Sequence, residues 1–214
     1  MTERQARPRT RDRAGNGSAG GTEAAILDAT QRLLGEMHLE ELTVAHVLDG
    51  AGVSRATFYF YFESKQAVVA ALLRRVMGEL FETARGWFDH DGDEPQEALR
   101  QALHEVEAAW REHAAITNAA VEGWRSSPEL GELWGELVTG FSRAAARRIE
   151  RDRAAGLAPP GPPARPLAAA LVWMDERAYY LATSGGEPAL ESEARVAETL
   201  AEIWLRAVYG VGVT

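Results

Sequence analysis

Residues 43–65 read TVAHVLDGAGVSRATFYFYFESK, and this stretch decides how the N-terminal part of the chain folds. Thr43 is a favourable N-cap for a short helix, and Gly52 ends that helix shortly after Asp49. Ser54 can cap a second helix almost at once. Two short helices joined by a turn that contains glycine are typical of a helix-turn-helix, whose second helix reads DNA.

The aromatic run at residues 58–62 divides between two surfaces of the second helix. Phe58 and Phe62 lie one helical turn apart, so we expect both in the core. Tyr59, Phe60 and Tyr61 cannot all point inward on the same helix. The sequence therefore predicts an apolar face that packs and a second face that is left for another partner.

The order G-V-S-R-A-T-F-Y-F-Y-F-E-S-K, residues 52–65, closely resembles the signature of the TetR family of bacterial repressors. Within that family the aromatic run looks most like the EthR-like members. The resemblance implies an N-terminal three-helix domain that contains the helix-turn-helix, attached to a larger helical body. It also implies that Tyr59, Tyr61 and Lys65 meet phosphates, while Arg55 and Thr57 face base edges. The exposed Phe60 could press on a thymine methyl. The full set of predicted DNA-binding residues is Thr43, Ser54, Arg55, Thr57, Tyr59, Phe60, Tyr61 and Lys65.

Composition sets limits on the chemistry of the 214-residue chain. There is no cysteine, which excludes disulfides, thiolate catalysis and zinc held by cysteine. No apolar run reaches the ~18 residues needed to span a membrane, and the N-terminus lacks the apolar middle of a signal peptide. We therefore expect a cytoplasmic protein.

The formal net charge of −9 is unevenly distributed. Residues 1–75 hold ten basic and nine acidic residues, whereas residues 76–214 hold 13 basic and 23 acidic residues. This asymmetry is consistent with a near-neutral head that can present a local basic face to DNA, and with an acidic body that does not contact DNA.

Three domains are expected along the chain. Residues 1–21 are rich in Arg, Gly, Pro, Ser and Thr, which predicts a disordered basic arm that either follows DNA or is simply a solvated tail. Residues 22–66 form the DNA-binding domain, and residues 67–214 form the ligand-binding and dimerisation domain. No segment alternates with the period of a strand, so the fold class is all-α, with about nine helices.

Helix signals in the body are clear at several points. Ser64 caps a helix that continues to about Phe88, and Pro95 can occupy the first turn of the next one. Ser127 and Pro128 begin a long helix, and a proline-rich linker occupies residues 159–166.

The last two helices carry apolar residues in steps of four and three, a spacing suited to helix packing in bundles. The family resemblance assigns these helices to a homodimer in which two helices from each subunit form a four-helix bundle. The alternative is that they pack only within their own subunit. The predicted interface residues are Leu167, Leu171, Val196, Leu200, Ile203 and Ala207.

Tryptophan is concentrated in the body, where five of the six lie between Trp110 and Trp204. Aromatic rings beside small side chains can line an elongated apolar cavity, although any single ring is more often core. In the resemblance, Trp134, Phe141 and Trp204 fall at cavity positions, and Asp175 is the expected polar anchor for a ligand that carries a donor or a cationic group. The predicted ligand-binding residues are Val106, Trp110, Trp134, Val138, Phe141, Val172, Asp175 and Trp204.

The sequence thus predicts a homodimeric transcription regulator that senses a small hydrophobic molecule and binds a palindromic operator. Two alternatives remain: a ligand-independent DNA-binding or architectural protein and, more distantly, an all-helical enzyme. The five histidines show no metal-binding spacing, and no nucleophile motif is present. We expect no cofactor and no metal.

Overall fold

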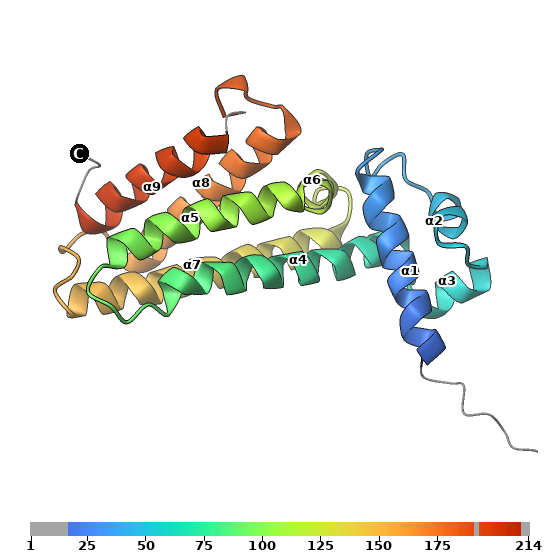
Figure 1. Ribbon diagram of the computed structural model, residues 1–214, viewed down its shortest axis with the longest axis horizontal. Helices are drawn as coiled ribbons and strands as arrows, with labels where there is room; N and C mark the ends of the chain where they lie inside the picture. The colour runs from blue at the N-terminus through green and yellow to red at the C-terminus, as the bar shows by residue number, and fades with distance from the viewer. Residues whose placement is uncertain (1–16, 191–192, 211–214) are drawn as a thin grey trace, which may run out of the picture.

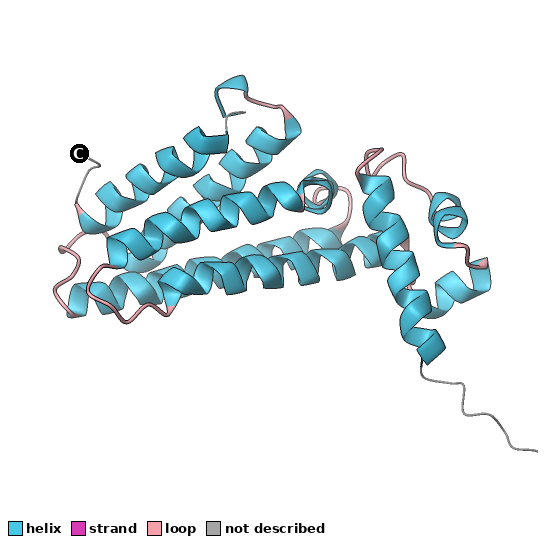
Figure 2. Cartoon of the chain, in the orientation of Figure 1, coloured by secondary structure: helices cyan, strands magenta, loops and turns pink. Residues whose placement is uncertain are grey.

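The computed structural model describes residues 17–190 and 193–210, and every regular element in these ranges is helical (Figures 1 and 2). The elements are α1 (Gly17–Leu34), α2 (Val44–Ala51), α3 (Arg55–Tyr61), α4 (Lys65–Phe88), α5 (Pro95–Glu112), α6 (Ala114–Gly123), α7 (Pro128–Ala154), α8 (Ala164–Ser184), the short 3-10 helix η1 (Pro188–Leu190) and α9 (Glu193–Tyr209). The all-α fold class is therefore confirmed.

Local capping explains the helix-turn-helix. The Thr43 hydroxyl accepts a hydrogen bond from the His46 N–H at 3.2 Å, and the His46 ring accepts one from the Thr43 N–H at 3.3 Å. Gly52 ends α2 in the left-handed conformation with φ of 64°, which a residue with a Cβ adopts only at a cost. The Ser54 hydroxyl then caps α3 by accepting from the Thr57 N–H at 3.1 Å.

Helix α4 joins the head, α1–α3, to the body (Figure 1). Ser64 caps it by accepting from the Ala67 N–H at 3.0 Å, and the helix runs to Phe88 as predicted. One cluster of buried side chains extends from Phe58 in the head through Val68 on α4 to Trp110 in the body. Because the core is continuous, the head and the body pack against one another across the expected domain boundary between residues 66 and 67.

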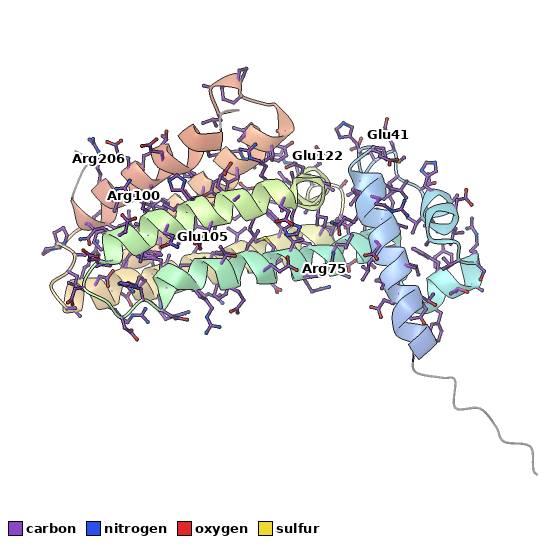
Figure 3. All side chains as sticks on the ribbon, viewed as in Figure 1. Glu41, Arg75, Arg100, Glu105, Glu122 and Arg206 are labelled. Carbon is purple, nitrogen blue, oxygen red and sulfur yellow. The ribbon has the colours of Figure 1, made fainter. Side chains whose placement is uncertain are left out.

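A second connection between head and body lies at the loop that follows α1. The His38 Nδ1 atom lies 3.2 Å from a carboxylate oxygen of Glu122 near the end of α6, and the Glu122 label in Figure 3 lies beside the head. On α4, the Arg75 guanidinium donates to the Gln31 side chain of α1 at 2.8 Å. The head is therefore attached to the body through α6 as well as through α4.

In the body, α4, α5 and α7 run side by side along its length, and α8 and α9 cover α5 and α7 (Figure 1). At the end away from the head, the Arg148 guanidinium of α7 is buried. It donates to Asp152 at 2.9 Å and to the Trp87 carbonyl at 2.9 Å. The Tyr209 hydroxyl donates to the same Asp152 oxygen at 2.6 Å, which joins α9 to this network.

One expectation changes in the N-terminal part of the chain. Helix α1 begins at Gly17, so residues 17–21 are helical and do not belong to a disordered arm. Glycine is a poor helix former, but these residues extend a helix that is already anchored by buried Ile26. The rest of the predicted arm, residues 1–16, lies outside the described residues.

Candidate DNA-binding surface and ligand cavity

Helix α3 presents the side chains that were predicted to meet DNA. Phe58 is buried at the core of the head, and Phe62, which caps α3, is also buried. Arg55 is exposed, and the exposed fractions of Tyr59 and Phe60 are 48% and 79%. Exposure of the large apolar side chain of Phe60 to water costs free energy, and a second surface that covers it would remove this cost. The geometry thus gives one exposed face of basic and aromatic side chains.

The remaining predicted DNA-binding residues lie at the ends of the short helices. Thr43 and Ser54 are exposed, but their hydroxyls already act as helix caps. Thr57 is half-buried, and its hydroxyl lies 2.7 Å from that of Ser54. Tyr61 is also half-buried and packs its ring against Phe60 with 5.0 Å between centroids. Thr43 and Ser54 therefore have a structural role in addition to the predicted one.

Lys65, the only lysine in the sequence, has a structural role in the head. Its ammonium donates to the carbonyls of Leu39, at 2.7 Å, and Leu42, and a longer contact of 3.4 Å reaches the Glu40 carbonyl. Burial lowers the pKa of this ammonium, and Glu40 partly opposes that effect. Lys65 thus anchors the loop between α1 and α2, and its contact with phosphate remains a prediction.

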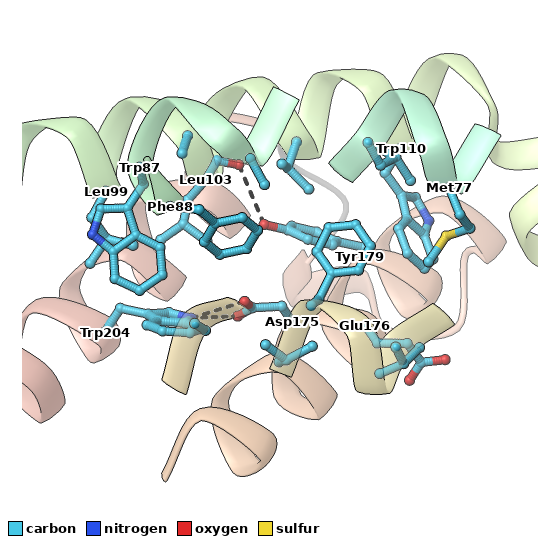
Figure 4. Close-up of a pocket in the computed structure, with 18 residues that line it drawn as sticks. Met77, Trp87, Phe88, Leu99, Leu103, Trp110, Asp175, Glu176, Tyr179 and Trp204 are labelled. Carbon is cyan, nitrogen blue, oxygen red and sulfur yellow. Dashed lines mark hydrogen bonds between the residues drawn. The ribbon is translucent and has the colours of Figure 1, made fainter. Parts of the chain in front are cut away.

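The body encloses an apolar cavity between α4, α5, α7, α8 and α9 (Figure 4). Its volume is ≈ 80 Å³, and the wall is aromatic and aliphatic apart from two carboxyl side chains. Its lining residues are Met77, Leu80, Ala84, Trp87, Phe88, Leu99, Ala102, Leu103, Val106, Trp110, Val138, Phe141, Ala145, Val172, Asp175, Glu176, Tyr179 and Trp204. The predicted ligand-binding residues among them are Val106, Trp110, Val138, Phe141, Val172, Asp175 and Trp204.

Trp134 was predicted to form part of the cavity wall and does not. It is buried behind Trp110, whose ring it meets edge-on at 5.9 Å between centroids. Val138, one turn further along α7, lines the cavity instead, and so does Phe141 in the next turn. Helical spacing assigns all three residues to one inner face of α7, but does not tell which of them a neighbouring ring covers.

Helix α4 was expected to border the cavity, but none of its residues was among the predicted ligand-binding residues. Trp87 and Phe88 line the end away from the head, and Trp87 meets Trp204 edge-on with 5.4 Å between centroids. The Trp87 indole N–H donates to the Tyr209 hydroxyl at 3.0 Å, which holds the ring in place. Burial and the hydrogen bond to Asp152 raise the pKa of Tyr209. The only sequence signal was that Trp87 precedes the other five tryptophans at the end of a long amphipathic helix.

Polar atoms in the wall are few. Both carboxylate oxygens of Asp175 accept from the Trp204 indole N–H, at 3.0 and 2.9 Å (Figure 4). Burial raises the pKa of Asp175 well above its ordinary value, and the Trp204 bond opposes that effect. The Tyr179 hydroxyl donates to the Leu103 carbonyl at 3.4 Å. The expected polar anchor, Asp175, is thus at the wall but already has a partner.

The predicted dimer surface divides into two sets. Leu171, Val196 and Leu200 are buried within their own subunit, so their side chains offer little area to an interface, and their part in a dimer stays a prediction. Helix α5 packs against α9, the helix that carries Val196 and Leu200. Ile203 is 39% exposed and remains free to contact a second copy. The other two predicted residues, Leu167 and Ala207, are half-buried.

Two properties of the described residues bear on other functions. They contain no group of three or more His, Asp or Glu side chains that could hold a metal ion. No helix among them is long and apolar enough to cross a membrane.

Comparisons with known proteins agree with this geometry. Residues 26–72 match the family of bacterial regulatory proteins named after tetR, and residues 99–210 match the C-terminal domain of the transcriptional regulator EthR. The EthR regulator of Mycolicibacterium smegmatis is 37% identical over 95% of this chain and 93% of its own length. The EthR regulator of Mycobacterium tuberculosis is 35% identical over 95% of this chain and 94% of its own length.

Solved structures share the fold. SmeT, the repressor of the Stenotrophomonas maltophilia multidrug efflux pump SmeDEF, has a TM-score of 0.71 at 21% identity. The match covers 87% of this chain and 91% of SmeT. A regulator described as TetR-family from Syntrophomonas wolfei has a TM-score of 0.73 at 14% identity and covers 91% of this chain and 99% of its own. The chain therefore belongs to the TetR family of bacterial regulatory proteins and is an EthR-like transcriptional regulator.

Proposed function

We propose that this regulator is a repressor that binds a palindromic operator as a homodimer and is released when a small hydrophobic molecule enters the body cavity. The observation that carries the proposal is the path of α4. Its first residue, Lys65, anchors the loop between α1 and α2 in the head, and its second half, from Met77 to Phe88, forms part of the cavity wall. A ligand that displaces α4 would therefore also displace the head.

On the DNA side, Arg55 and Thr57 read base edges, while Tyr59, Tyr61 and Lys65 contact phosphates. Support comes from the exposure of Arg55 and Tyr59 on α3 and from the match of this segment to the family. Arginine is well suited to guanine because its guanidinium can donate two hydrogen bonds to one base. Because bacterial DNA lies in the cytoplasm, the protein acts there.

A dimer is required for a palindrome, since each head covers one half-site. In the proposed assembly, α8 and α9 of two subunits pack as a four-helix bundle around Ile203, Leu167 and Ala207. The two α3 helices must then lie about 34 Å apart, or a multiple of that distance, to enter successive major grooves on one face of DNA.

On the ligand side, the cavity volume of ≈ 80 Å³ is smaller than a typical ligand pocket, which is about 300 Å³ or more. A ligand larger than a few atoms must therefore push the helices apart. Such a ligand favours a body that differs from the unliganded one, which is the requirement for coupling to DNA.

The alternative is a DNA-binding protein whose body senses nothing. Titration with decan-1-ol, followed by tryptophan fluorescence and by anisotropy of a labelled operator fragment, separates the two. We expect a change in fluorescence, because Trp87, Trp110 and Trp204 line the cavity, together with release of DNA. Unchanged fluorescence and unchanged DNA binding across a panel of neutral, cationic and anionic amphiphiles would favour the ligand-independent alternative.

A further inference from the structure

Helix α8 brings two consecutive carboxyl side chains to a cavity that is otherwise apolar. Asp175 and Glu176 both line it, and they are only 8% and 5% exposed. Among the lining residues, which Figure 4 draws as sticks, none is basic. The wall thus combines two acidic groups with aromatic and aliphatic side chains.

Glu176 is poorly compensated for a buried carboxyl. Neither of its oxygens has a hydrogen bond of normal geometry within the described residues, although the Trp134 indole lies close enough to lower its pKa slightly. The Arg177 Nε atom lies 3.7 Å from one oxygen, but that guanidinium is half-exposed and stacks over Tyr180. Burial dominates and raises the pKa of Glu176.

Asp175 has one partner for two oxygens. A single N–H, that of Trp204, serves both of them at 3.0 and 2.9 Å. A carboxylate has about four acceptor positions, so most of the acceptor capacity of Asp175 is unused. The carboxyls of two consecutive residues, which point in different directions in Figure 4, are therefore left with little positive charge nearby, which is costly in free energy.

We propose that the cavity selects an amphiphile with a positively charged head, a lipophilic ammonium, held by Glu176 and Asp175. This inference rests on the proposed sensor function and specifies its ligand class. The ammonium supplies the missing opposite charge and donates to the unused acceptors. The faces of Trp110 and Tyr179 add cation–π attraction, and the alkyl chain follows the apolar wall toward Trp87. The acidic body, residues 76–214, attracts a cation from solution.

The test compares three ligands that share one chain length: octylamine, octan-1-ol and octanoate. Calorimetry and tryptophan fluorescence measure their affinities for the intact dimer at pH 7. We expect octylamine to bind about 10- to 100-fold more tightly than octan-1-ol, because hydrogen bonds to charged groups contribute more than neutral ones, and octanoate to bind most weakly. Tighter or equal binding of octan-1-ol would overturn the proposal but leave a sensor of neutral ligands.

Two isosteric variants test whether Glu176 and Asp175 cause the preference for octylamine over octan-1-ol. Glu176→Gln and Asp175→Asn should each reduce the ratio of octylamine to octan-1-ol affinity severalfold, and the double variant should abolish it. Glu150→Gln, on the exposed surface of α7, removes the same charge outside the cavity and should leave the ratio unchanged. A ratio that falls equally in Glu150→Gln would reveal attraction to the acidic surface alone and refute the assigned site. If none of the three ligands binds, both the ligand class and the sensor function for ligands of this size fail.

Discussion

At the scale of single residues, the proposed recognition of DNA rests on side chains of α3. Arg55 is exposed on this helix, whereas Phe58 is buried and holds the helix in the core. We predict that Arg55→Ala costs about 1 to 3 kcal/mol of operator binding and relaxes specificity at one position of each half-site. Competition binding against a randomised operator library measures both effects. Arg143→Ala, an exposed arginine on α7 in the body, is the matched control and should bind as the wild type does.

Lys65 anchors the loop between α1 and α2 and is predicted to contact phosphate, and two measurements on one variant test these roles. Two hydrogen bonds, to the carbonyls of Leu39 and Leu42, use two of its three N–H groups, and only the long contact to Glu40 uses the third. We predict that Lys65→Met destabilises the head by about 1 to 3 kcal/mol, because carbonyls that are partly or fully buried lose their partner. Loss of the predicted phosphate contact should also flatten the salt dependence of DNA binding by about one ion. Denaturant unfolding that matches the wild type would contradict the anchoring role.

The cavity illustrates what residue patterns can predict. Seven of its lining residues follow from family position and helical spacing, because a buried face recurs every three or four residues. Trp134 and Trp87 show the limit. Both are large, buried rings on inner helix faces, yet only Trp87 reaches the cavity, because Trp110 covers Trp134. Which ring borders the cavity depends on packing between helices that are distant in the sequence. The spacing of residues along one helix does not predict that packing.

At the scale of elements, α9 shows the same limit for an interface. Its 4-3 stripe predicts an apolar contact, but not whether α5 of the same subunit or a partner provides it. Leu200 is 4% exposed and Ile203 is 39% exposed. We therefore predict that Leu200→Ala lowers the free energy of unfolding by about 2 to 5 kcal/mol, as truncation of buried leucine does.

Ile203→Glu should instead leave the fold intact and yield monomers that lose specific operator binding, because it places a charge in the proposed interface. Light scattering and thermal melting of the two variants distinguish these effects. A dimeric Ile203→Glu would show that this part of α9 is not the interface.

The contact between the loop after α1 and helix α6 depends on a histidine. Glu122 raises the pKa of His38 above its ordinary value of 6.5 through a hydrogen bond and its charge, and Glu41 and Glu40 add to this. Since the folded-state pKa is the higher one, the stabilisation is present below the unfolded pKa and is lost as pH rises through the folded pKa. We predict that an NMR titration of His38 gives a pKa above 6.5 in the wild type, and that Glu122→Gln lowers it. An identical titration curve in both proteins would argue against the contact.

On the scale of the whole molecule, the proposed coupling between the head and the cavity rests on the helices that they share. Helix α4 extends from the head to Phe88 at the far end of the cavity, and α6 holds the loop after α1 through Glu122. A ligand can shift this arrangement only by its difference in affinity for the two body conformations, typically about 1 to 3 kcal/mol. Because the cavity volume is only ≈ 80 Å³, a larger ligand requires the wall to move, which supplies such a difference.

A large side chain inside the cavity should therefore imitate the ligand. Ala102 on α5 is 6% exposed and lines the cavity, so Ala102→Phe adds a ring where helices must separate to accept it. We predict operator binding weakened by about 5- to 150-fold with helical content retained, measured by anisotropy and circular dichroism. Ala108→Phe, on the exposed face of α5, controls for the substitution itself. If Ala102→Phe were to bind the operator as tightly as Ala108→Phe while folded, expansion of the cavity would not reach α3, and the route through α4 would be wrong.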